Sequence, residues 1–190
     1  MTTTDGAPFV VDVRALLGKP GAYQRLTLTG AAGPNVATAV VTVAEDEPVT
    51  AEVMLESVRE GILVTGSART TGDAVCSRCL DPVRIDLQAD LQELYAWSLE
   101  EAEVDDLGEP GPHLDGENLN LRPPIRDGLI LEMPLAPLCS TDCQGLCAQC
   151  GARLDDDPGH AHETSDPRWA ALSALKADLL DEQAETPKEN

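Results

Sequence analysis

Residues 83–92 read Val-Arg-Ile-Asp-Leu-Gln-Ala-Asp-Leu-Gln, so apolar and polar residues alternate without interruption. Successive side chains of a β-strand point to opposite faces of its sheet, and the alternation therefore predicts a strand with one buried and one solvated face. Sheets that are solvated on one face are commonly antiparallel. The stretch thus indicates an antiparallel sheet that packs its core on one side.

The residues before this strand indicate further strands. Residues 36–43 are rich in β-branched side chains, and residues 51–56 alternate Ala, Val and Leu with Glu and Met. The Glu-Gly pair at 60–61 is typical of a hairpin turn, after which residues 62–70 run back along the previous strand. The first half of the chain is therefore predicted to be rich in antiparallel strands.

A Cys-x2-Cys pair, Cys76 and Cys79, separates the predicted strand at residues 62–70 from the one at residues 83–92. Consecutive antiparallel strands can be joined by a short turn. We therefore expect both thiols at the tip of a long hairpin.

The composition changes after this hairpin. Residues 98–118 carry eight acids and no Lys or Arg, with Gly and Pro interspersed, which predicts a solvated, flexible loop. Residues 119–121 predict a short strand, and the Pro-Pro pair at 123–124 predicts the start of a helix that ends near Pro134. A last helix is predicted from its N-cap at Asp166. The apolar residues of the first helix are Ile125, Leu129, Ile130 and Met133. Those of the second form one stripe that either packs on the sheet or is offered to a partner: Trp169, Leu172, Leu175 and Leu179.

Four more cysteines lie within twelve residues, in the pattern Cys139-x3-Cys143-x3-Cys147-x2-Cys150. A Cys-x2-Cys turn lets two sulfurs reach one tetrahedral zinc ion, and four ligands complete a structural site. The six cysteines exceed the needs of one such site. His160 and His162 are separated by a single residue and follow in a loop, so two imidazoles could add to the ligand set.

Three arrangements of these residues remain open from the sequence. With two zinc ions, one is held by Cys147, Cys150, His160 and His162 and the other by Cys76, Cys79, Cys139 and Cys143. With one ion, the ligands are either Cys139, Cys143, Cys147 and Cys150 or the two Cys-x2-Cys pairs, and the histidines are only solvated. In the third arrangement no metal binds.

These patterns predict an α+β protein: an antiparallel β-sheet meander with a few covering helices and a C-terminal zinc-binding segment. The predicted domain organisation has four parts. They are residues 1–97, an antiparallel β-rich domain; residues 98–118, an acidic flexible loop; residues 119–165, a helix plus a Cys/His-rich zinc-binding segment; and residues 166–190, a C-terminal helix and tail.

The charge of the chain restricts its partners. Lys and Arg number 13 against 34 Asp and Glu, a net charge of -21. Non-specific binding of nucleic acid depends on cations that neutralise phosphates, so this charge disfavours it and favours a basic protein partner. The spacing of the Cys and His residues leaves no room for the recognition helix of a DNA-reading finger, so no DNA partner is expected.

The ends and motifs of the chain restrict its location and chemistry. The N-terminus has no signal-peptide pattern and no segment approaches the roughly 20 apolar residues of a membrane span, so we expect a cytoplasmic protein without a membrane partner. Nucleophile-elbow, Walker-type and dinucleotide-binding motifs are absent, so no catalytic residue is assigned and no enzyme is predicted. A Cys-x2-Cys redox protein and a zinc-stabilised interaction scaffold remain alternative functions.

Three segments of the chain resemble the YceD family. They are Cys76-Ser-Arg-Cys79-Leu80, the cysteine-rich run from Leu138 to Leu154, and the run from Asp166 to Lys176. The resemblance covers nearly the whole chain. It implies a factor that supports accumulation of large-subunit ribosomal RNA, often encoded beside a small ribosomal protein. A ribosomal protein or pre-ribosomal particle is then the expected partner, and direct contact with RNA is left open.

The resemblance also bears on the metal ligands. Some members of the family carry Cys-x-Cys where His160 and His162 stand, which implies that these two residues are ligands. Other members lack most of the cysteines, which implies that zinc has a structural role and is not the activity itself. The family supplies no catalytic residues to transfer.

Overall fold

The computed structural model describes residues 8–162 and Leu172. The chain divides into two compact units, residues 1–145 and residues 146–190. The predicted C-terminal helix, from Asp166 onward, lies outside the described residues except for Leu172. Within the described part of the chain, no helix is long and apolar enough to cross a membrane.

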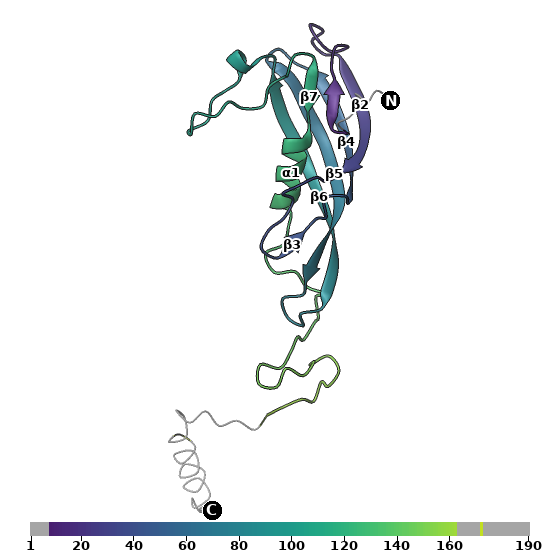
Figure 1. Ribbon diagram of the computed structural model, residues 1–190, viewed down its shortest axis with the longest axis vertical. Helices are drawn as coiled ribbons and strands as arrows, with labels where there is room; N and C mark the ends of the chain where they lie inside the picture. The colour runs from purple at the N-terminus through teal and green to yellow at the C-terminus, as the bar shows by residue number, and fades with distance from the viewer. Residues whose placement is uncertain (1–7, 163–171, 173–190) are drawn as a thin grey trace, which may run out of the picture. The chain divides into compact units, whose positions relative to one another are not determined.

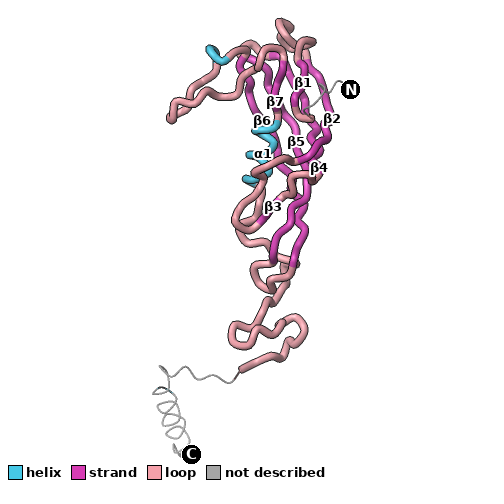
Figure 2. Tube along the Cα trace, in the orientation of Figure 1, coloured by secondary structure: helices cyan, strands magenta, loops and turns pink. Residues whose placement is uncertain are grey.

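A five-stranded antiparallel sheet dominates the first unit (Figures 1 and 2). Each strand of the meander pairs with the next, and the shortest strand pairs with the far end of the longest hairpin. The meander consists of β2 (Tyr23–Ala31), β4 (Pro48–Ser57), β5 (Gly61–Val75) and β6 (Pro82–Ala96), and the short strand is β3 (Val41–Thr42). The predicted antiparallel meander is therefore confirmed.

The β5–β6 hairpin is the longest feature of this sheet. Its register is unbroken from the pair Gly61 and Ala96 to the pair Val75 and Pro82. Residues 83–92, from which the sheet was predicted, lie inside β6, and their apolar side chains face the core while the polar ones are exposed. Cys76 and Cys79 occupy the turn at the tip, as predicted.

Residues 36–43 were predicted to form one extended strand, and the structure differs from this prediction. Only Val41–Thr42 forms a strand. The chain folds back on itself there, because the Thr38 amide donates to the Val41 carbonyl and the Val43 amide donates to the Val36 carbonyl. Val36, Val41 and Val43 are buried in the core nevertheless, whereas Val40 is exposed. The β-branched run therefore reflects burial in a tight turn and not an extended backbone.

One face of the sheet is covered by a small ribbon and a helix. The ribbon pairs β1 (Val10–Asp12) with β7 (Asn118–Asn120), and the helix α1 spans Arg122–Leu131 (Figure 1). The strand predicted at 119–121 and the proline-initiated helix are thus present. α1 is the single α-helix within residues 8–162, and the second predicted helix, from Asp166 onward, falls outside that range.

A glycine allows α1 to approach the sheet closely. A Cβ atom added to Gly128 would lie 3.1 Å from the Ala89 Cβ and 3.5 Å from the Leu91 Cδ2, both on β6. On the same helix, Ile125 and Leu129 are buried in the core. Close backbone approach and apolar burial together fix α1 against β6.

The acidic segment 98–118 begins with a 3-10 turn, η1 (Leu99–Glu101). Val104 and Pro110 form an isolated antiparallel bridge within it. Near its end the Ala96 amide donates to the Pro112 carbonyl, the Leu114 amide donates to the Ala96 carbonyl, and Leu114 is buried. The segment is thereby joined to the end of β6.

Candidate metal centres

Four cysteines from two distant parts of the first unit meet at the tip of the β5–β6 hairpin. Their sulfurs all lie within 4.8 Å of one another. Cys76 Sγ lies 3.9 Å from Cys143 Sγ, and Cys79 Sγ lies 3.6 Å from Cys139 Sγ. A tetrahedral zinc ion with bonds of about 2.3 Å separates its sulfur ligands by about 3.8 Å. The spacing of this first group therefore fits four sulfurs around one such ion.

Backbone contacts hold the two parts of the first group together. The Ser77 amide donates to the Pro137 carbonyl, and the Arg78 guanidinium donates to the Cys143 carbonyl, each at 2.8 Å. Gly145 must be a glycine, because its φ is 81° and an added Cβ atom would lie 2.9 Å from the Arg78 carbonyl oxygen. The loop after α1 is thus docked on the hairpin turn through its backbone.

The environment of the first group favours a positive ion among the sulfurs. Cys76, Cys79 and Cys143 are buried, while Cys139 is exposed. Hydrogen bonds from the amides of Cys79, Arg78 and Cys139 lower the pKa of Cys76 to about 6. Burial raises the pKa of Cys143. One thiolate therefore forms readily, and a divalent cation would supply the charge that favours the others.

A second group lies in the second unit and combines two thiols with two imidazoles. The ligand atoms of Cys147, Cys150, His160 and His162 also lie within 4.8 Å of one another. Cys150 Sγ is 3.2 Å from Nε2 of each histidine, and the two Nε2 atoms are 2.8 Å apart. Two thiolates and two imidazoles form a donor set that is typical of structural zinc.

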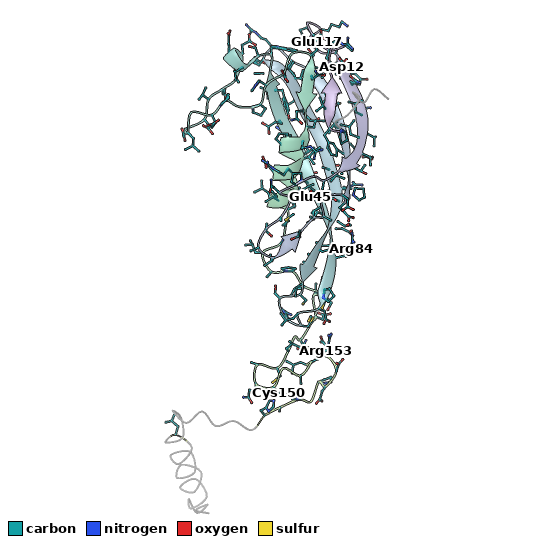
Figure 3. All side chains as sticks on the ribbon, in the orientation of Figure 1. Asp12, Glu45, Arg84, Glu117, Cys150 and Arg153 are labelled. Atoms are coloured by element: carbon teal, nitrogen blue, oxygen red, sulfur yellow. The ribbon has the colours of Figure 1, made fainter. Side chains whose placement is uncertain are left out.

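A turn around Cys147 prepares the first two ligands of the second group. The Cys147 amide donates to the Ala152 carbonyl, and the Gly151 amide donates back to the Cys147 carbonyl. Gly151 has a φ of 72°, in the left-handed region that favours glycine. Amide hydrogen bonds from Cys150 and Gln149 lower the pKa of Cys147 to about 6. The side chain of Cys150 lies in the same loop (Figure 3).

Asp157 lies beside the second group and was not among the residues predicted for it. Its carboxylate lies 3.7 Å from the Nδ1 atom of His160, on the opposite side of the ring from Nε2. A carboxylate near the non-ligating nitrogen commonly orients a metal-binding histidine. The sequence does show an acid three residues before His160. Asp155 and Asp156 are its neighbours, so the sequence alone could not single out Asp157.

The structure places every predicted ligand in one of these two groups. The two groups contain the same residues as the two sites of the arrangement with two zinc ions. His113, for which no role was predicted, lies outside both groups, and its Nδ1 contacts the Gly111 carbonyl oxygen at 2.9 Å.

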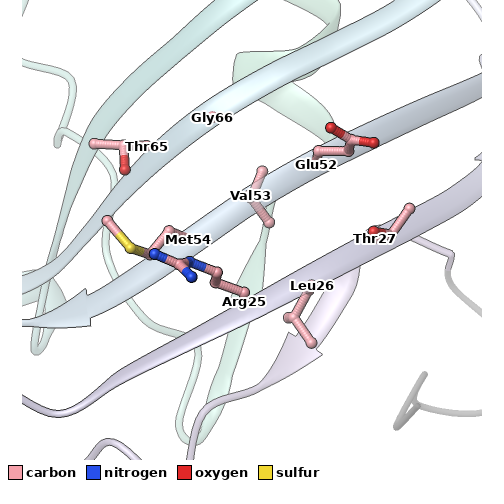
Figure 4. Close-up of a pocket in the computed structure, with 8 residues that line it drawn as sticks. All are labelled: Arg25, Leu26, Thr27, Glu52, Val53, Met54, Thr65 and Gly66. Atoms are coloured by element: carbon pink, nitrogen blue, oxygen red, sulfur yellow. The ribbon is translucent and has the colours of Figure 1, made fainter.

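The solvated face of the sheet carries a hollow of about 490 Å³ (Figure 4). Arg25 extends across the hollow toward Met54, its partner in the register of β2 and β4. Glu52 is the single acid that lines the hollow, and no Cys or His is among the lining residues. The lining consists of Arg25, Leu26, Thr27, Glu52, Val53, Met54, Thr65 and Gly66. The ligand chemistry of the two groups is therefore not repeated there.

Residues 64–176 match the model of a protein family. The description of that family is large ribosomal RNA subunit accumulation protein YceD. The chain belongs to the YceD family. Both candidate metal centres fall inside the matched range, from Cys76 at the tip of the hairpin to His162. The resemblance found in the sequence is thus confirmed.

Relatives of this YceD-family chain occur in mycobacteria. An uncharacterized protein of Mycobacterium tuberculosis is 38% identical over 170 residues, which cover 87% of this chain and 80% of the relative. An uncharacterized protein of Mycobacterium leprae is 32% identical over 180 residues, which cover 95% of this chain and 83% of the relative. No solved structure is significantly similar.

Proposed function

We propose that this YceD-family chain is a non-enzymatic factor that supports accumulation of large-subunit ribosomal RNA and whose fold is held by structural zinc. The family description carries the ribosomal part of the proposal. The first group carries the metal part, because four sulfurs within 4.8 Å of one another, with two of the separations at 3.6 and 3.9 Å, suit a closed four-thiolate site. Such a site has no open position for a substrate.

Zinc is the proposed ion because of the donor sets. Thiolates and imidazoles are soft or borderline ligands, whereas magnesium and calcium take oxygen ligands. The first ion would join the hairpin turn to the loop after α1, and Cys76, Cys79, Cys139 and Cys143 would hold it. Its contribution is to the free energy of folding and not to a reaction.

The proposed setting is the cytoplasm, with a basic ribosomal protein or a pre-ribosomal particle as partner. The net charge of -21 supports this, since an acidic surface attracts basic segments and speeds their encounter at low salt. The chain would then act by holding or delivering such a component during assembly. Co-purification from cell extract at low and at high salt tests the partner directly.

Depletion of the protein in its host tests the ribosomal role. We expect the ratio of large-subunit to small-subunit ribosomal RNA to fall, and the ratio to recover when the wild-type gene is restored. A Cys139→Ser gene should restore it poorly, whereas a Ser140→Ala gene, altered at the exposed neighbouring residue, should restore it fully. An unchanged ratio after depletion would contradict the ribosomal role and leave an interaction scaffold as the better description.

A thiol–disulfide redox function is the second candidate. The two Cys-x2-Cys pairs favour it, because the sulfurs of each pair lie within 4.8 Å of each other and such pairs can be redox-active. The redox function predicts reversible oxidation with retained fold and reductase activity toward insulin disulfides. A zinc-loaded protein without such activity would exclude this candidate.

A further inference from the structure

The two candidate centres differ in what surrounds them. In the first group, Cys76, Cys79 and Cys143 are buried, with Val83 and Leu138 packed against them. The hairpin holds one pair of sulfurs, and the hydrogen bonds of Ser77 and Arg78 hold the loop that carries the other pair. This arrangement is prepared by contacts that do not involve the ligand atoms.

The second group has backbone hydrogen bonds at the Cys147 turn, but it lacks the buried surroundings of the first group. Residues 146–162 contain no buried residue and no α-helix or strand beyond the single bridge between Leu146 and Arg153. Cys150 and His162 are exposed, and Cys147 and His160 are only half-buried. The loop therefore has no apolar core that could offset the entropy of ordering its backbone.

The turn and the histidine segment of this loop converge at the ligand atoms themselves. Cys150 Sγ lies 3.2 Å from the Nε2 atoms of His160 and His162, which follow it by ten and twelve residues. Without an ion, a thiol and two imidazoles supply little attraction to hold this arrangement. An ion bonded to all four residues would close the loop.

We propose that the second group is an exchangeable zinc site and that the bound ion itself orders residues 146–162. This inference rests on the proposed function only for the identity of the ion. The first group is preorganised, so its ion dissociates slowly. The second group must disorder and reorder its loop with each exchange, and its exposed ligands admit a competing chelator. The fraction of chains with an ordered loop then follows the concentration of free zinc.

The test uses the full-length protein loaded with two equivalents of zinc and then mixed with excess chromogenic chelator. We expect two kinetic phases of zinc release, each of about one ion per chain, with the first at least about tenfold faster. Cys150→Ser should remove the fast phase. Cys139→Ser, at the exposed member of the first group, should remove the slow phase. Ala148→Ser, at an exposed non-ligand in the second loop, should change neither phase.

Cobalt supplies a second readout that does not depend on rates. After the fast-released zinc is removed, added Co²⁺ should fill the second group alone. Each cobalt ion there has two thiolate ligands and not four, so its thiolate-to-metal charge-transfer absorption should be about half that of cobalt in the first group. Amide resonances of residues 146–162 should shift on filling, while those of β5 and β6 should not.

Different outcomes of these experiments would contradict different parts of the two proposals. Two ions released in one phase, or a fast phase that survives Cys150→Ser, would overturn the exchangeable site while leaving structural zinc in place. Protein that binds no zinc would overturn the structural-zinc part of the proposed function as well. Cobalt absorption of four-thiolate intensity after fast exchange would show that the first group is the labile one.

Discussion

Cys79 and Cys139 lie 3.6 Å apart although sixty residues of sequence separate them. Each sulfur in such a group depends on the other three, because a single missing ligand opens the tetrahedron. Three of the four cysteines are buried, so a change at one of them also alters the packing at the tip of the hairpin. A substitution at a buried cysteine therefore changes metal binding and packing together, whereas one at the exposed Cys139 acts mainly on metal binding.

Cys79→Ser should lower the free energy of unfolding of the zinc-loaded protein by on the order of 3 kcal/mol or more, because a lost ligand weakens metal binding that is linked to folding. Ser77→Ala, at an exposed residue of the same turn, is the control and should stay within about 0.5 kcal/mol. Urea unfolding together with zinc analysis measures both effects. Equal stability of the two variants would argue against a structural ion at this group.

Tyr95 offers a second test at the level of one atom. Its hydroxyl donates to the Asn120 carbonyl at 2.6 Å and joins β6 to β7, and its side chain is buried. Tyr95→Phe should cost about 1 kcal/mol of stability near pH 7, the usual net value of a hydrogen bond. Tyr23→Phe, at an exposed tyrosine, should cost almost nothing.

The same tyrosine predicts a pH effect. Burial raises the pKa of Tyr95 above the value of about 10 that a tyrosine has in an unfolded chain. The unfolded state then loses this proton first, so the stability due to neutral Tyr95 is complete below about pH 10 and falls as the pH rises above it. Urea unfolding from pH 9 to 11.5 should show a shallower fall for Tyr95→Phe than for wild type. Parallel curves would contradict the assignment.

The ligand residues could be predicted from the sequence, but their grouping could not. Spacing alone singled out six cysteines and two histidines, because Cys-x2-Cys turns suit one ion. Whether Cys139 belongs with Cys76 or with Cys150 depends on how the loop after α1 meets the hairpin. The hydrogen bonds from Ser77 to Pro137 and from Arg78 to Cys143 hold that loop on the hairpin turn, and no local pattern encodes such contacts.

At the level of elements, α1 provides a matched pair of substitutions. Leu129 is fully buried against the sheet, whereas Leu131, two residues later, is 83% exposed. Leu129→Ala should destabilise the protein by about 2 to 5 kcal/mol, because it leaves a cavity in the core. Leu131→Ala should change stability by less than about 0.5 kcal/mol. Thermal or urea unfolding compares the two, and similar losses would mean that α1 does not pack as described.

The elements that could be predicted are those with a recognisable pattern of side chains in the sequence. Alternation in residues 83–92 identified β6, and the paired prolines identified the start of α1. No bounds were predicted for β2, an edge strand whose alternation ends in Gly30 and Ala31. Residues 36–43 misled because β-branched side chains suit any buried, extended or tightly turned segment.

At the level of the whole molecule, charge is the dominant feature. The chain carries a net charge of -21, and several ion pairs within residues 8–162, such as Arg14 with Glu117, lie at the surface, where each contributes little. Repulsion among the acids therefore outweighs these attractions. The folded state concentrates that repulsion more than the unfolded chain does.

Added salt should stabilise the protein. Raising NaCl from about 0.02 to about 0.5 M shortens the screening length several-fold, so the melting temperature should rise by a few degrees. Differential scanning calorimetry at constant zinc measures this, and KCl at the same concentrations controls for effects of the particular cation. A melting temperature that falls with salt would show that attractive ion pairs dominate.

The wide separation of the first group in sequence has a consequence during translation. The pair at the tip of the hairpin leaves the ribosome sixty residues before Cys139, which at ordinary rates of synthesis is roughly 3 to 12 seconds. During that interval a nascent chain presents a dithiol with no partners. Any chain that terminates between residues 80 and 138 never acquires the other two cysteines of the group. Such an incomplete product keeps a reactive dithiol that is buried in the complete protein.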